Sequence, residues 1–105
     1  MLMISETLLE QVKRKCYITD ESYLTSRKVS DMIAENIVTV RRMIGVPNDF
    51  DFEALGNEEE LKLLKNYCWY DWNDSSNEFI SNYHDDITSL HRKHEGLNYA
   101  SNEEK

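Results

Sequence analysis

Three histidines lie close together near the end of the sequence and are the first candidates for chemistry. His84, His91 and His94 fall within one expected helix, where His94 lies among the apolar positions and the other two share a flank. His91 and His94 could form a weak metal site with Glu95, but a structural zinc ion takes four ligands and the chain has no HExxH motif. We therefore expect surface or hydrogen-bonded core histidines and no metal site.

Other residue patterns that support catalysis are missing from the sequence. Asp85 and Asp86 are adjacent, so a helix points them to different sides and they cannot act as an acid–base pair. The serines stand in no nucleophile elbow, and no glycine-rich loop could hold a phosphate. Cys16 and Cys68 lack CxxC spacing, which predicts reduced, buried thiols. The sequence thus predicts neither an enzyme nor a bound cofactor.

Length and charge exclude further classes of protein. The 105 residues fit one small domain, and 25 of them are Leu, Ile, Val or Phe, enough for a folded core. A net charge of −8 repels the phosphate backbone of nucleic acid, so we expect no tight DNA binding. No apolar run approaches the ~20 residues of a membrane span, and residues 1–16 lack the leading positive charge of a secretory signal. We expect a protein that stays inside the cell that makes it.

The spacing of apolar residues predicts helices, and with one proline and three glycines the chain has few helix breakers. The first helix is expected over about residues 6–16, with Ser5 as its cap. The second and longest helix follows a cap at Thr19 or Asp20. It should end at Gly45, which can adopt the left-handed conformation that terminates helices.

Two more helices complete the expected fold. The third runs from about residue 58 to 73, with Asn57 as its cap and Glu60 in the position of a capping box. The polar residues 73–76 should interrupt the chain before the fourth helix, because their side chains compete for backbone hydrogen bonds. Gly96 should close that last helix.

The predicted fold is all-α: a small four-helix domain over residues 1–96, with two long core helices and a short N-terminal helix. Residues 97–105 are expected to form a flexible C-terminal tail. The first helix should pack alongside a core built by the other three. That core is expected to contain Val29, Ile33, Ile37, Val40, Leu61, Leu64, Cys68, Phe79, Tyr83 and Ile87.

Apolar residues outside this core predict contact with other proteins. The third helix carries aromatic and aliphatic residues on several faces, and a domain of this size cannot wrap one helix entirely. The alternative, in which these rings lie flat on the domain with their polar edges in water, stays open. The acidic loop at 49–53 and the tail also carry apolar residues in solvated segments. The expected interface residues are Leu63, Tyr67, Trp69, Tyr70, Phe50, Phe52, Leu97 and Tyr99.

Three stretches, taken in order, resemble one protein family. They are LLEQVKRKCYITDES, VRRMIGVPNDFDFE and ELKLLKNYCWYDWNDSSNEFISNYHDDITSL, and together they cover residues 8–90. The first has a short leucine–valine–lysine helix before an acidic cap, the second an isoleucine–glycine turn before an acidic loop. The third has an asparagine–tyrosine–cysteine core, aromatic pairs, an asparagine break and a phenylalanine-led helix. In order and spacing they resemble the head-tail connector proteins, also called head completion or adaptor proteins, of long-tailed bacteriophages.

The resemblance implies a structural virion protein without catalytic residues, made in the bacterial host cytoplasm and located at the head-tail interface. Such proteins form a homo-oligomeric ring beneath the portal protein, a dodecamer in the virion, and can be monomers in isolation. They contact a downstream stopper or tail-completion protein, and genome DNA passes through without specific binding. An acidic lumen suits that role because it repels the duplex and lets it slide. Related proteins can carry a longer C-terminal arm, and here only about ten residues follow Gly96.

A second interpretation of the same sequence is a small acidic helical regulatory protein that binds a basic protein partner. The two interpretations differ in assembly, since a connector forms rings or binds a portal oligomer and a regulator is a monomer or dimer. A small hydrolase would need a converging site, which the sequence lacks.

Overall fold

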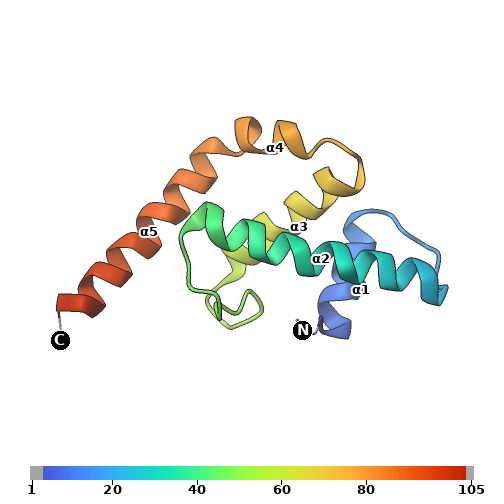
Figure 1. Cartoon of the computed structure of the whole chain (residues 1–105), viewed down its shortest axis with the longest axis horizontal. Coiled ribbons are helices and arrows are strands. Elements are labelled where there is room, and N and C mark those ends of the chain that lie inside the picture. Colours follow the sequence, from blue (N-terminus) through green and yellow to red (C-terminus); the bar gives the residue numbers. More distant parts are fainter. Residues whose placement is uncertain (1–3, 104–105) are drawn as a thin grey trace.

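The computed structural model describes the backbone of residues 4–103 and the side chains of residues 4–96. Within that part the chain is all-α, without strands, which confirms the predicted fold class. The chain spans 49 × 28 × 21 Å, and the last helix forms one end of the long axis (Figure 1). The elements are α1 (Glu6–Lys15), α2 (Tyr23–Ile44), α3 (Glu58–Trp72), α4 (Ser76–Asn82) and α5 (His84–Glu103).

The first two helices begin at serine caps. The Ser5 hydroxyl accepts a hydrogen bond from the Leu8 amide at 3.0 Å, as predicted. The cap of α2 is Ser22, whose hydroxyl accepts from the Thr25 amide, so the prediction of Thr19 or Asp20 as cap is wrong by two or three residues. Asp20 instead holds the turn by accepting from the Ser22 amide and the Thr25 hydroxyl. The hydrogen bond from Thr25 is the main reason why the pKa of Asp20 lies below its usual value.

Three helices end at a residue with left-handed backbone conformation. Gly45 (φ 70°) ends α2 as predicted, and the Val46 amide donates to the Arg41 carbonyl. Tyr17 and Asp74, both at φ 58°, follow α1 and α3 in the same conformation. For residues other than glycine this conformation costs about 1–2 kcal/mol, so both turns carry strain that a glycine would avoid.

The expected fourth helix is two helices. Tyr83 (φ −114°, ψ 18°) departs from helical backbone angles and separates α4 from α5, although its amide still donates to the Phe79 carbonyl and its carbonyl accepts from the Ile87 amide. The break over residues 73–76 is therefore followed by a second, milder one. Gly96 does not close the last helix, which continues to Glu103, and the predicted boundary there is wrong. A glycine inside a helix costs only about 1 kcal/mol, and Gly96 has no positive φ that would turn the chain away.

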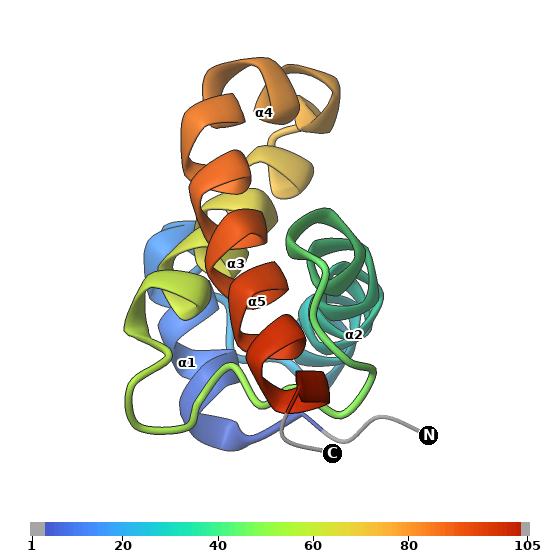
Figure 2. The same ribbon diagram turned by 90° about the vertical axis from the view of Figure 1, so that its left-hand side faces the viewer.

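The third helix lies at the centre of the fold. It contacts α1, α2 and α4 along its length, and Figure 2 shows α1 and α2 on either side of it with α5 crossing in front. Glu58, Glu59 and Lys62 nevertheless stay exposed, so the domain does not surround this helix entirely, as expected. The neighbouring helices bury Leu63, Leu64 and Cys68 and leave the aromatic residues of α3 partly exposed.

The buried core contains most of the predicted residues. Leu61, Tyr83 and Ile87 are only partly buried and pack at its edge, so the prediction that they belong to the buried core is wrong. The first helix supplies fully buried side chains of its own, and the loop before α3 supplies one. The buried apolar residues are Leu8, Val12, Cys16, Val29, Ile33, Ile37, Val40, Ile44, Phe52, Leu63, Leu64, Cys68, Phe79 and Leu90.

Candidate functional site

A buried carboxylate joins α3 to α5. Glu60 has no exposed surface, and its Oε2 atom lies 2.6 Å from His94 Nε2 and 3.0 Å from Lys93 Nζ. His94 is itself buried, and its ring packs edge-on against Phe50 with a centroid distance of 5.2 Å. The other carboxylate oxygen of Glu60, Oε1, has no hydrogen-bond partner.

The charge state of this contact follows from its partners. Desolvation is the largest influence on Glu60 and raises its pKa, but the hydrogen bonds from Lys93 and His94 outweigh it, and the pKa lies below its ordinary value. Glu60 is therefore ionised at neutral pH and can only accept hydrogen bonds. His94 Nε2 must then carry the proton. The arrangement fixes α5 on α3.

The capping-box prediction for Glu60 is wrong, because its side chain turns inward. Asn57 gives α3 no side-chain cap either, since its amide donates to the Asp51 carbonyl at 2.7 Å. A signal for the true role exists in the sequence: Glu60, Leu64 and Cys68 are spaced by four and share one helix face. An acidic residue on the buried face of one helix, together with a histidine on the buried face of another helix, indicates that the two side chains form a hydrogen-bonded pair.

The predicted interface rings of α3 mostly contact their own chain. Tyr67 and Tyr70 pack edge-on against Phe79 of α4, at 4.9 and 5.4 Å between centroids, and Phe79 stacks on Tyr83 at 4.6 Å. These contacts hold α4 on the C-terminal half of α3. Trp69 is partly buried and lies edge-on to Tyr70 at 5.2 Å, so it is less exposed than we expected.

The other described members of the predicted interface are also covered by the chain itself. Leu63 and Phe52 are buried, and the expectation that they are surplus surface residues is wrong for both. Phe52 anchors the acidic loop in the core and stands edge-on to Phe50 at 5.1 Å. Arg41 fixes the same loop by donating to the Phe50 carbonyl at 2.8 Å. The side chains of residues 97–105, including Leu97 and Tyr99, lie outside the described residues.

The described side chains contain no group of three or more histidines, cysteines or carboxylates that could hold a metal ion. His94 is turned toward Glu60, whereas His91 lies against Gly45, where an added Cβ atom would come within 3.0 Å of its Nε2 atom. Both cysteines are free and buried. Burial raises the pKa of Cys16 to about 11 and of Cys68 to about 12, so neither thiol is a nucleophile at neutral pH.

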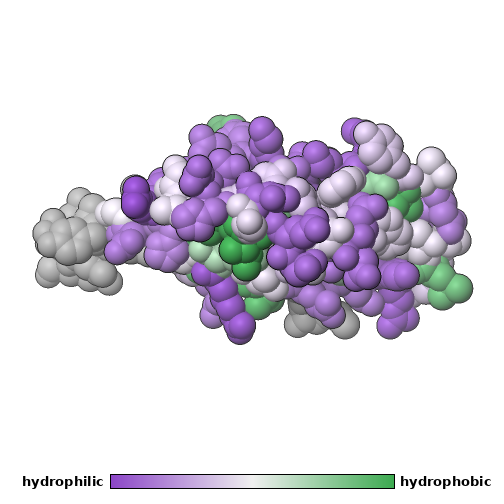
Figure 3. All heavy atoms as spheres, turned by 90° about the horizontal axis from the view of Figure 1, so that it is seen from above, coloured by the Kyte–Doolittle hydropathy of each residue, from purple (hydrophilic) through white to green (hydrophobic). Residues whose placement is uncertain are grey.

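The strongly exposed apolar residues lie elsewhere than predicted. Tyr17, Tyr23 and Leu24, at the turn from α1 into α2, expose 86%, 73% and 78% of their surface. Leu55, in the loop before α3, exposes 97%. Figure 3 shows one face of the molecule, which is mostly hydrophilic with a few small hydrophobic areas. Single exposed apolar residues are common on folded proteins, whereas the three at the α1–α2 turn lie close together in the sequence.

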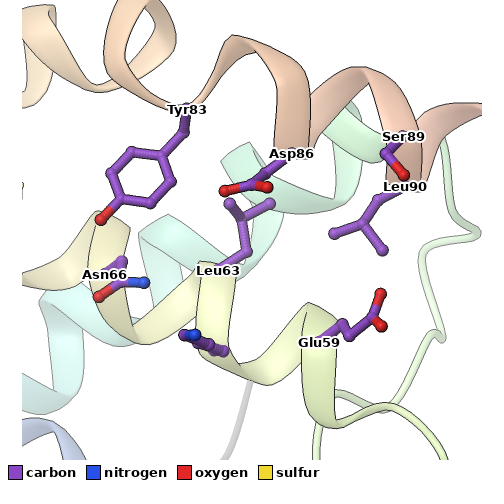
Figure 4. A pocket seen from close by; sticks show the side chains of 8 residues that line it. Glu59, Leu63, Asn66, Tyr83, Asp86, Ser89 and Leu90 are labelled. Carbon is purple, nitrogen blue, oxygen red and sulfur yellow. The ribbon is translucent and has the colours of Figure 1, made fainter.

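A cleft of about 470 Å³ lies between α3 and α5 (Figure 4). Leu63 and Leu90 point into the space between the two helices and form its apolar floor. Its charged residues Glu59, Lys62 and Asp86 are all exposed at the rim. Tyr83, at one end of the cleft, is partly buried, and this burial raises the pKa of its hydroxyl above the ordinary value.

None of the helices in the described part of the chain is both long enough and apolar enough to span a membrane. Comparison of the chain with protein-family models, with curated proteins and with solved structures finds no match in any of the three.

Proposed function

We propose that this chain is a structural head-tail connector of a bacteriophage or prophage. It assembles as a ring beneath the portal, extends the DNA channel and joins the capsid to the stopper or tail. The sequence resemblance over residues 8–90 is the starting point of the proposal. An all-α domain of this size is what that resemblance implies.

The observation that carries the proposal is the separation of the exposed apolar residues. The most exposed ones fall in two places: Tyr17, Tyr23 and Leu24 lie at the α1–α2 turn, and Leu55 lies in the loop before α3. Val38 and Ile80, at 46% and 56%, are less exposed and stand singly. A subunit of a closed ring contacts its two neighbours through two different patches, so it needs two apolar areas at separate places. A monomeric regulator needs one.

Charge supports the same role. Each copy contributes a net charge of −8, so a ring of many copies surrounds its channel with negative charge. Such a field repels the phosphates of a passing duplex and avoids the counterion release that holds DNA on basic proteins.

Assembly with the portal is the direct test. The chain, mixed with the portal protein encoded in the same genome, should add a ring of density below the portal in negative-stain images. Thr7→Ala, at an exposed position of α1, is the matched control and should add the same ring. A phage in which residues 97–105 are deleted should fill its capsids with DNA but fail to retain it or to join tails. Normal infectious particles from that deletion, with no ring density for the wild type, would favour the acidic regulator.

A further inference from the structure

A second cleft, of about 390 Å³, lies where the end of α1 meets α3 and the α4–α5 junction. Its walls are aromatic: Trp69 stands edge-on to Tyr70 at 5.2 Å, and Tyr70 to Tyr83 at 5.7 Å. Its rim is basic, and no acidic residue lines it. The lining residues are Arg14, Lys15, Tyr17, Asn66, Trp69, Tyr70 and Tyr83.

The lining of this cleft suits a segment that has an apolar side chain flanked by carboxylates. Aromatic walls accept an aliphatic side chain, and Arg14 and Lys15, both exposed, are placed to pair with flanking acids. Tyr17 provides an independent indication that the cleft binds a partner. It keeps the strained left-handed conformation although its ring is almost fully exposed and contributes little to the chain's own core.

The same chain presents a segment of that chemistry. Leu55, the most exposed large apolar residue among those described, lies between Glu53 on one side and Glu58 and Glu59 on the other, all three exposed. The segment is held in shape, because the Gly56 amide donates to Glu58 Oε1 at 3.2 Å. The burial of Phe52 fixes its other end. An ordered loop loses little conformational entropy when it binds.

We propose that the Leu55 loop of one copy docks in the aromatic–basic cleft of the next copy. Figure 1 places the loop along the lower edge of the molecule, and the ends of α1, α3 and α4 that border the cleft lie above it. Because the two patches differ and lie apart, the contact is heterologous and repeats from copy to copy. The charges agree, with Glu53, Glu58 and Glu59 of one copy meeting Arg14 and Lys15 of the next. This inference names the subunit contact of the ring and so rests on the proposed function.

Cysteine crosslinking tests the contact directly, since both native thiols are buried. A short bis-maleimide should join Leu55→Cys to Tyr17→Cys when the two variants are mixed, and neither variant should crosslink alone. The double variant should give a ladder of oligomers. Ile80→Cys, an exposed position on α4, is the matched control and should not join to Leu55→Cys. Equal crosslinking of the control, self-crosslinking of Leu55→Cys alone, or no heterodimer in the mixture would overturn the proposal.

Charge reversal gives a second readout. The variant Arg14→Glu/Lys15→Glu should weaken self-association about tenfold or more, measured by sedimentation. Glu59→Lys, mixed with it, should restore association, because the attraction is regained with opposite signs, while Glu58 keeps its hydrogen bond from the Gly56 amide. Lys62→Glu, an exposed cation outside the cleft, should leave association unchanged. Lack of restoration contradicts the pairing.

The outcomes separate this contact from the proposed function. A ring on the portal without the Leu55–Tyr17 crosslink refutes the contact and leaves the connector role standing. The crosslink without any portal binding refutes the connector role and leaves the contact between copies.

Discussion

The hydrogen bond between Glu60 and His94 provides the sharpest test of how the last helix is held. We consider the substitution His94→Leu, which keeps roughly the volume of the side chain and removes its hydrogen bond. Glu60 would then be fully buried, with Oε1 already lacking a partner and Oε2 bound only to Lys93. The Lys93 side chain is 41% exposed, so water screens much of its contribution.

Removing one partner of a buried charge pair costs about 3–5 kcal/mol, which we expect for His94→Leu. A small domain has a total stability of only about 5–15 kcal/mol, so the loss should be large in a urea titration. Lys93→Ala should cost only about 1 kcal/mol, because its ammonium group is partly in water. Glu60→Met/His94→Leu should cost less than His94→Leu alone, because no buried charge is left without its partner.

The pH dependence supplies an independent check. Since the folded-state pKa of Glu60 lies below its ordinary value of 4.5, the group stabilises the fold above that value. This contribution is lost as the pH falls from about 4.5 through the lower folded pKa. The stability difference between the wild type and Glu60→Gln should therefore shrink over that range. Equal costs for His94→Leu and Lys93→Ala, or strictly additive costs in the double variant, would refute the reasoning.

Three further outcomes are expected. Ile37→Ala removes a buried side chain from α2 and should cost about 2–5 kcal/mol in thermal or urea unfolding; a wild-type melting curve would show that the α2 face is misassigned. Tyr17→Gly should stabilise the isolated chain by about 1 kcal/mol by relieving the left-handed strain, yet weaken self-association in sedimentation; a loss of stability would contradict the strain argument. Cys16 and Cys68 should react with a maleimide at pH 8 only as fast as the chain opens, since both thiols are buried and burial also raises their pKa values; rapid labelling of the native protein would show them exposed.

The sequence allowed a good prediction of α2 and a poor one of what surrounds α3. In α2, Val29, Ile33 and Val40 repeat at helical spacing on one face, and Gly45 marks the end, so periodicity and turn chemistry agree. Around α3 the pattern shows several apolar faces. It does not say whether the chain's own helices or another subunit cover them.

The site was harder to predict for the same reason. Glu60 looks like a capping residue as long as only its own helix is considered, and its partner His94 lies 34 positions away. The tertiary packing decides which helix crosses α3 and beside which residues of α3 it lies. The break at Tyr83 has the same origin, since neither proline nor glycine marks it and the stacking of Tyr83 on Phe79 accompanies it.

The anchoring of α5 has a mechanical consequence. Leu90 and His94 are the last buried residues among the described side chains, and nine residues of the helix continue beyond His94, which is about 13 Å at 1.5 Å per residue. The helix is thus anchored beside Glu60 and projects beyond that point. A sideways load at the far end would tilt the helix and stretch the contact of His94 with a carboxylate that has no exposed surface. A push at the tip would therefore reach α3, in the middle of the body, without any loop between them.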